Sequence, residues 1–92
     1  MNVFEGRKFR IQKTPEEVSV GMSVLVMYDS NLYLGKITEA FKHKRKHALL
    51  VEYSIENIGK INERFFYIKN KQQWLPKTFG EGCGALKFEV EK

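Results

Sequence analysis

The most concentrated chemistry in the sequence is a basic run, Lys-His-Lys-Arg-Lys-His, at positions 42–47. Four permanent cations and two histidines in six residues cannot all be buried, so we expect them to project from the tip of a hairpin. Such a tip can neutralise phosphates of a nucleic acid without reading its sequence. The alternative is a solvated turn that discourages aggregation. We predict a nucleic-acid surface made of Lys42, His43, Lys44, Arg45, Lys46 and His47, extended by Arg7, Lys8 and Arg10.

Other reactive side chains lack the partners that catalysis or metal binding requires. His43 and His47 stand among cations that repel Zn²⁺, with no thiolate or carboxylate inside the run. Cys83 lies in a Gly-Glu-Gly-Cys-Gly segment that lacks the Lys-Ser/Thr and the helix of a phosphate-binding loop. Nothing in the pattern orients a histidine against the Cys83 thiol. We therefore expect a binding protein that is not an enzyme and has no metal and no cofactor.

Composition bounds the kind of molecule and its partners. Ninety-two residues make one domain, and 42% apolar and 13% aromatic residues favour a folded chain over a disordered tail. A formal net charge of +5 suggests an anionic partner such as nucleic acid. A single cysteine excludes an internal disulfide and suits a reducing compartment. No apolar stretch approaches the roughly 18 residues that span a bilayer, so we expect a cytosolic or nuclear protein with no membrane partner.

The elements that must position these side chains read as short strands. From position 22 the apolar residues alternate, which places Val24, Val26 and Tyr28 on one face of a strand. A polar turn at 29–31 leads to a second strand over 33–41, in which Gly35 indicates a bend or bulge. Further strands are predicted over 48–53 and 64–69, separated by a long polar loop over 54–63. A closing turn or short fifth strand is expected at 74–76.

The two ends of the chain carry their own signals. Thr14, Pro15 and Glu17 stand where the N-cap, N1 and N3 residues of a helix would, but no amphipathic run follows, so one short turn is expected. Alternation in Leu-Lys-Phe-Glu-Val at 86–90 predicts a candidate edge strand. We predict an all-β fold: a five-stranded SH3-like barrel over 18–77, with an N-terminal arm at 1–17 and a C-terminal extension at 78–92.

Four short sequence motifs occur in the order that is typical of a known domain family. They are Gly-x-x-Val-x-Val at 21–26, Leu-Tyr-Leu-Gly-Lys-Ile at 32–37, Val-Glu-Tyr-Ser at 51–54 and Asn-Glu-Arg-Phe-Phe at 62–66. Together they resemble the chromo-barrel, or Tudor-knot, domains of chromatin proteins, and the second string is similar to the Tudor domains of Polycomb-like proteins. The match runs from about 18 to 68 and leaves both ends unexplained.

The resemblance implies a site for a methylated lysine. Members of this family often hold the methylammonium in a cage of aromatic rings, because a cation is attracted to electron-rich ring faces. Carried over by position, the cage candidates are Tyr28, Tyr33 and Tyr53, with Phe65 as a replacement wall and Glu56 as a hydrogen-bond acceptor. Where the family has a loop tryptophan, this chain has Ile55 and Glu56. Tyr28, Tyr33 and Tyr53 also fit half-buried positions in the core of a small barrel. For a further tyrosine, Tyr67, the core position is the interpretation that we favour.

These features together predict a nuclear chromatin-reader module. It would bind a methylated lysine of a histone tail, with DNA or RNA held by the basic run, and belong to a larger chromatin complex. Two alternatives stay open: an SH3-like barrel that binds only DNA or RNA, and a protein–protein interaction module. The second alternative predicts binding that is insensitive to salt.

Overall fold

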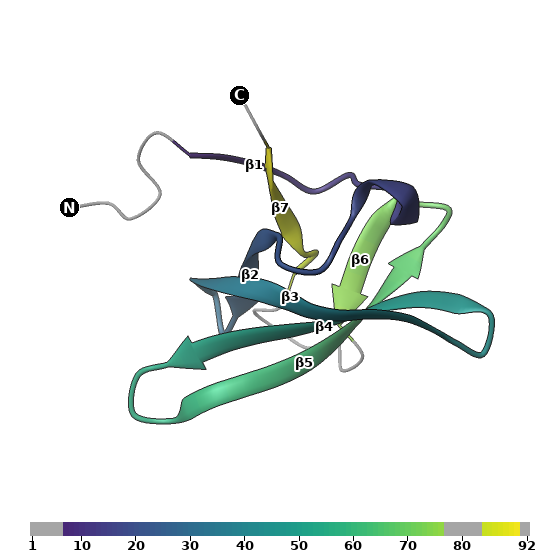
Figure 1. Ribbon diagram of the computed structural model, residues 1–92. Helices are drawn as coiled ribbons and strands as arrows, with labels where there is room; N and C mark the ends of the chain where they lie inside the picture. The colour runs from purple at the N-terminus through teal and green to yellow at the C-terminus, as the bar shows by residue number, and fades with distance from the viewer. Residues whose placement is uncertain (1–6, 77–83, 91–92) are drawn as a thin grey trace.

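The computed structural model describes residues 7–76 and 84–90. They form one antiparallel sheet of seven strands in the order β1-β7-β2-β3-β4-β5-β6 (Figure 1). The elements are β1 (Lys8–Arg10), a 3-10 turn η1 (Pro15–Glu17), β2 (Ser23–Tyr28), β3 (Asn31–His43), β4 (Lys46–Ile55), β5 (Gly59–Ile68), β6 (Gln73–Pro76) and β7 (Lys87–Val90). The all-β prediction is therefore confirmed. Cys83 and the rest of the predicted glycine turn at 80–83 lie outside the described residues.

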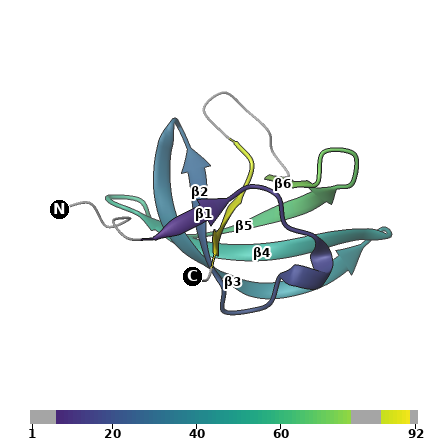
Figure 2. The same ribbon diagram turned by 90° about the horizontal axis from the view of Figure 1, so that it is seen from above.

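The sheet curls until β6 approaches the segment that enters β7 (Figure 2). The backbone N–H of Leu86 donates to the carbonyl of Trp74 in β6 at 2.8 Å. A register shift between Ile37 and Glu39 marks a bulge in β3, and bulges bend strands. We predicted this irregularity at Gly35, which instead permits close packing: a Cβ there would lie 2.8 Å from the Glu52 carbonyl oxygen. The curl turns one face of the sheet inward.

The inward face makes the hydrophobic core. It draws nearly fully buried side chains from β2 to β7 and from the segment just before β7: Val24, Val26, Ile37, Leu49, Val51, Phe65, Trp74, Leu86 and Phe88. Burying each large side chain stabilises the fold by about 1.5–3 kcal/mol. The predicted strand near the C-terminus is confirmed, but it pairs with both β1 and β2 and so does not lie at an edge. Its Phe88 packs against the Trp74 ring in the core. The outer edges of the sheet are β1 and β6.

The long polar loop predicted over 54–63 is wrong. β4 continues to Ile55 and β5 begins at Gly59, so only a short turn joins them. Positive φ angles at Asn57 and Gly59, 72° and 105°, let the chain reverse there. Lys60 and Asn62 are exposed on one face while Ile61 packs against the core from the other. The polar residues at 60 and 62 belong to the solvated face of a strand, and the high polar content of this segment led to the wrong prediction of a loop.

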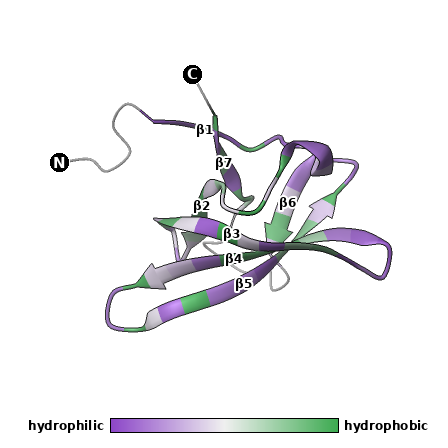
Figure 3. Ribbon diagram, viewed as in Figure 1, coloured by the Kyte–Doolittle hydropathy of each residue, from purple (hydrophilic) through white to green (hydrophobic). Residues whose placement is uncertain are grey.

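The β2–β3 and β3–β4 hairpins were placed correctly. Asp29 and Ser30 join β2 to β3, and Lys44 and Arg45 join β3 to β4, with positive φ at all four residues. Two central residues with positive φ make the turn whose twist matches antiparallel strands. The basic run is thus a hairpin tip, as predicted, although only Lys44 and Arg45 form the turn itself. Figure 3 shows this tip as a continuous hydrophilic stretch.

Candidate nucleic-acid interface

The basic hairpin, residues 42–47, extends from the ends of β3 and β4. Lys42 faces His47 across the two strands, and His43 faces Lys46. Neighbouring cross-strand pairs point to opposite faces of a sheet, so His43 and His47 cannot share a metal ion. Across residues 7–76 and 84–90, no group of three or more His, Cys, Asp or Glu side chains is placed to hold one. The hairpin therefore presents cations and imidazoles on both of its faces.

A hollow of about 750 Å³ lies beside the basic hairpin. Its walls come from three segments: η1 with the preceding Thr14, the hairpin, and the turn between β5 and β6. Arg45, Lys46 and Lys69 bring positive charge to the walls, and Glu16 is the carboxylate among the lining residues. Asn70 adds an amide that can donate hydrogen bonds. The hollow thus combines cationic and neutral donors, which suits an anionic ligand.

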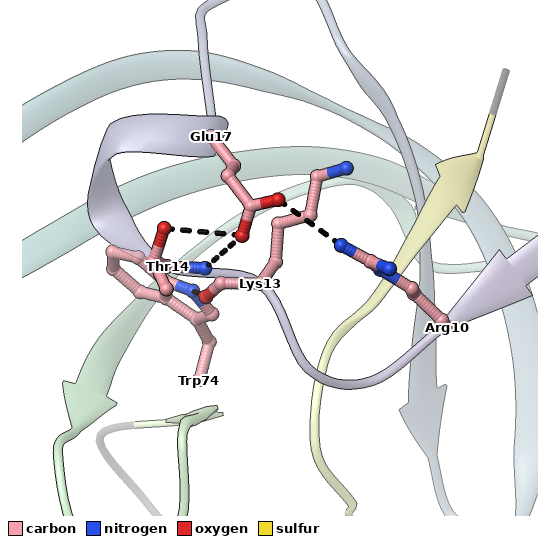
Figure 4. A network of polar contacts seen from close by, with 5 residues as sticks. All are labelled: Arg10, Lys13, Thr14, Glu17 and Trp74. Carbon is pink, nitrogen blue, oxygen red and sulfur yellow. Dashed lines mark hydrogen bonds and ion pairs between the residues drawn. The ribbon is translucent and has the colours of Figure 1, made fainter.

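A polar network holds η1 at the edge of this hollow (Figure 4). The indole N–H of Trp74 donates to the carbonyl of Lys13 at 2.9 Å, which ties the N-terminal segment to the core. Glu17 Oε1 accepts from the backbone N–H of Thr14 at 2.9 Å, and Glu17 Oε2 accepts from Arg10 at 3.1 Å. The predicted short turn is confirmed by this arrangement. The hydrogen bond from Trp74 to Lys13, just before Thr14, holds the wall that faces the hairpin.

The charge on Glu17 is stabilised by its neighbours. The backbone N–H of Thr14 is the largest cause that lowers the Glu17 pKa, followed by the Thr14 hydroxyl and then by the positive charges of Arg10 and Lys13. Each of these groups favours the ionised carboxylate. Glu17 therefore stays ionised at neutral pH, and its carboxylate keeps the hydrogen bonds to Thr14 that hold η1 in its folded conformation.

Ion pairing distinguishes the basic hairpin from the N-terminal cations. In the part of the chain that the structure describes, ion pairs join Arg7 to Glu89, Arg10 to Glu17 and Lys60 to Glu52, and none includes a hairpin cation. Arg7 forms two hydrogen bonds with Glu89, of 2.6 and 2.7 Å. This pairing raises the pKa of Arg7 and lowers that of Glu89.

The structure does not gather the N-terminal cations into the hairpin surface as we predicted. β1 forms the far edge of the sheet, separated from β3 by β7 and β2. Arg7 and Arg10 already have carboxylate partners, which offset the charge that each could offer to a phosphate. Lys8 is exposed on β1. Arg7 and Arg10 therefore have less charge free for a phosphate than the hairpin cations, and their part in binding stays a prediction.

The predicted aromatic cage lies at the other end of β3. The ring centroids of Tyr33 and Tyr53 are 6.0 Å apart, so the structure brings these two together. Tyr53 is only 3% exposed, and its hydroxyl donates to Glu63 Oε1 at 2.9 Å. Tyr28, at the end of β2, is 40% exposed and shares the inner face with Val26 by alternation. Tyr33 and Tyr28 therefore carry most of the ring surface that a ligand could reach here.

Two further cage candidates do not complete the cage. Phe65 is 1% exposed and lies between Leu49 and Pro76 in the core, so its assignment as a cage wall is wrong. Glu56 is exposed in the turn between β4 and β5, and its proposed hydrogen bond to a methylammonium stays a prediction. Tyr67 packs on Trp74 with ring centroids 5.1 Å apart, as the core interpretation predicted, and it also lines the hollow.

The sequence reasoning missed the contribution of the turn between β5 and β6. Lys69 and Asn70 follow β5 and lie beside the basic hairpin across the hollow. The signal was present in the strand order, because in consecutive antiparallel strands every second turn lies at the same end of the sheet. The turn after β3 and the turn after β5 must therefore meet.

Comparisons of the chain with protein-family models, with curated proteins and with solved structures return no match. Among the described residues, no helix is long and apolar enough to cross a membrane. Function is therefore inferred from the side chains and their arrangement.

Proposed function

We propose that this chain binds nucleic acid through its phosphate backbone, using the basic hairpin and the adjoining hollow. The observation that carries the proposal is that the hairpin cations differ from other cations of the chain in their ion pairs. The hairpin cations are exposed and form no ion pair with the described residues, whereas Arg7, Arg10 and Lys60 each have a carboxylate partner. Unpaired cations gathered on one projection attract a polyanion and release its condensed counterions on binding.

The proposed scaffold is an SH3-like barrel formed by β2 to β6. Three features support it: five consecutive antiparallel strands, the bulge that bends β3, and the hydrogen bond from Leu86, just before β7, to Trp74 in β6. A curled sheet of this kind holds turns rigidly at its ends. The basic hairpin then meets a ligand without first having to order itself, which lowers the entropic cost of binding.

The side chains that line the hollow would make different kinds of contact with a nucleic acid. Arg45 offers a planar fork of donors that matches two phosphate oxygens, while Lys46 and Lys69 act as compact charges. Asn70 and Gln72 add neutral donors for sugar or phosphate oxygens. None of these contacts requires a particular base, so binding is expected to tolerate many sequences.

Charge reversal at two matched places tests the proposal. Arg45→Glu with Lys46→Glu removes two cations from the hollow, and Lys36→Glu with Lys60→Glu makes the same change in net charge towards the opposite end of the sheet. Fluorescence anisotropy with labelled DNA and RNA at constant salt should give a loss of roughly 10- to 100-fold for the hairpin variant only. Equal losses in both variants, with folding verified by circular dichroism, would mean that net charge rather than this surface governs binding.

A second candidate function is recognition of a methylated lysine within a nuclear chromatin complex. The observation that favours it is the Tyr33–Tyr53 ring pair with exposed Tyr28 on the same face. Calorimetric titration with histone-tail peptides tests it: trimethylated peptide should bind, unmodified peptide should not, and Tyr33→Ala should abolish the difference. Equal affinity for both peptides would reject a methyl-lysine site.

A further inference from the structure

Two phenylalanines lie outside the core, on the outer face of the sheet beside the basic hairpin. Phe41 in β3 and Phe66 in β5 both face Ala48 in β4, so the three residues lie side by side across neighbouring strands. Leu49 and Phe65, the next residues along β4 and β5, point into the core, which fixes Phe66 on the opposite face. Phe41 and Phe66 are each half-buried, and neither belongs to the buried core cluster.

A cation and an imidazole frame these rings. The Arg64 guanidinium lies 5.9 Å from the centroid of the Phe41 ring, and the His43 ring lies 6.3 Å from that of Phe66. Arg64 and His43 are both exposed. We call Phe41, His43, Arg64 and Phe66 the outer aromatic patch. All four are planar groups on which a nucleobase can stack.

The patch is continuous with the basic hairpin. Lys46 faces His43 across the strand pair, so it stands on the same outer face, and Lys44 and Arg45 follow at the tip. The carboxylates on this face, Glu39 and Glu52, both lie farther from the tip than Phe41. The tip therefore supplies positive charge at one end of the rings, and Arg64 adds a cation beside Phe41, which matches a strand whose phosphates run beside its bases.

We infer that the preferred ligand is single-stranded nucleic acid, whose bases stack on Phe41 and Phe66 while its phosphates contact the basic hairpin. This inference rests on the proposed nucleic-acid function and names its ligand class. The bases of a duplex are stacked on one another and expose only their edges, whereas those of a single strand can turn a face to an aromatic ring. Aromatic stacking accepts every base, so the preference is for strandedness rather than for sequence.

Ring-removing substitutions test the inference on the full chain. Phe41→Leu and Phe66→Leu keep apolar cover over Ala48 but remove the rings, and Tyr28→Leu removes an exposed ring at the far end as a matched control. Binding is measured by fluorescence anisotropy with three labelled probes of equal length: a single-stranded oligothymidine, a duplex and an abasic strand. Thermal unfolding verifies that each variant is folded.

The expected result is specific to bases. Each patch variant should lose roughly 5- to 100-fold in affinity for oligothymidine, with an unchanged salt slope because no cation is removed. Affinity for the duplex and the abasic strand should not change, and Tyr28→Leu should bind like the parent. Phe66→Trp should retain binding because it keeps a ring.

Three outcomes would overturn the inference. If folded patch variants bind oligothymidine as tightly as the parent, Phe41 and Phe66 only cover Ala48. If the parent binds the duplex as tightly as the single strand, the ligand class is wrong while the proposed nucleic-acid function stands. If the parent binds none of the three probes, the proposed function fails and the inference fails with it.

Discussion

The two ends of the long strands β3 and β4 are built in different ways. At one end the buried Tyr53 hydroxyl donates to Glu63, and Lys60 pairs with Glu52. At the other end the basic hairpin leaves its cations exposed beside the hollow. About eleven residues along the chain separate Tyr33 from the hairpin turn, or roughly 35 Å at the rise of an extended strand. At the tyrosine end the polar groups of Tyr53 and Lys60 bond to carboxylates of the same chain, whereas at the hairpin end the exposed cations can bind a partner.

This difference assigns separate contributions to the two ends. Substitution of Tyr53 should change the free energy of unfolding, because its buried ring packs against Tyr33 and its hydroxyl donates to Glu63. Substitutions in the basic hairpin should change affinity, because exposed charges contribute little to the stability of the chain that carries them. Stability and affinity are therefore measured on the same variants. If every variant changed both quantities together, the two ends would not have separate roles.

The largest expected effect on stability is at Tyr53. Tyr53→Ala should lower the free energy of unfolding by about 3–5 kcal/mol, because it removes a large buried side chain, and Tyr53→Phe by about 1 kcal/mol, because it removes one hydrogen bond. Urea denaturation measures both, and nucleic-acid affinity at a temperature where the variants are folded should match that of the parent. A decrease below 1 kcal/mol for Tyr53→Ala would place this residue outside the core.

Neutralising the hairpin should produce the opposite result. In a variant with Lys44→Gln, Arg45→Gln and Lys46→Gln, stability should stay within about 0.5 kcal/mol of the parent. The slope of log K against log salt should become shallower by up to about 0.9 for each duplex phosphate that the variant no longer neutralises. Affinity is measured at several salt concentrations with one labelled duplex. An unchanged slope would mean that the phosphates bind to other residues.

A smaller effect is expected where the core meets the hollow. Trp74→Phe removes the indole donor to the Lys13 carbonyl and should lower the free energy of unfolding by about 1–2 kcal/mol. Hydrogen exchange should become faster at the amides of 14–17, because this bond ties η1 to the core. Tyr67→Phe, which keeps the ring next to Trp74, is the matched control. Equal protection of η1 in Trp74→Phe and the parent would contradict this anchoring role.

The smallest expected effect is the acid sensitivity of η1. The Thr14 backbone N–H, the Thr14 hydroxyl and nearby positive charge lower the Glu17 pKa in the folded chain. Its stabilising contribution is therefore complete above the usual pKa of a glutamate and is lost as pH falls through the lowered folded value. Carbon-detected NMR should give a Glu17 midpoint below the usual value of 4.5. Glu17→Gln should remove the contribution, and a midpoint at or above 4.5 would contradict it.

Local patterns predicted much of the strand framework. Alternation identified β2 and β7, and short polar residues identified the turn at Asp29 and Ser30, because these signals depend on backbone geometry within a few residues. The spacing of Thr14 and Glu17 likewise predicted η1. The position of the basic hairpin followed from the cost of burying charge, which needs no knowledge of tertiary contacts.

What failed depended on register and on long-range contacts. Phe65 and Phe66 are neighbours in sequence, yet one is in the core and the other faces outward, and a shift of one residue in register would exchange them. No local signal fixes that choice. The pairing of Arg7 with Glu89 joins residues 82 apart, so the sequence could not indicate that Arg7 is already partnered. The hollow likewise needs three distant segments to meet.

The most direct test of the binding end is a chemical-shift titration of the isotope-labelled chain with a short oligonucleotide. Backbone and side-chain resonances are followed from both ends of β3 in the same experiment. We expect the largest shifts at 42–47 and at Lys69, with Tyr28, Tyr33 and Ile58 unmoved. Shifts concentrated at Tyr28 and Tyr33, with the basic hairpin unmoved, would contradict it and would move the binding site to the tyrosine end.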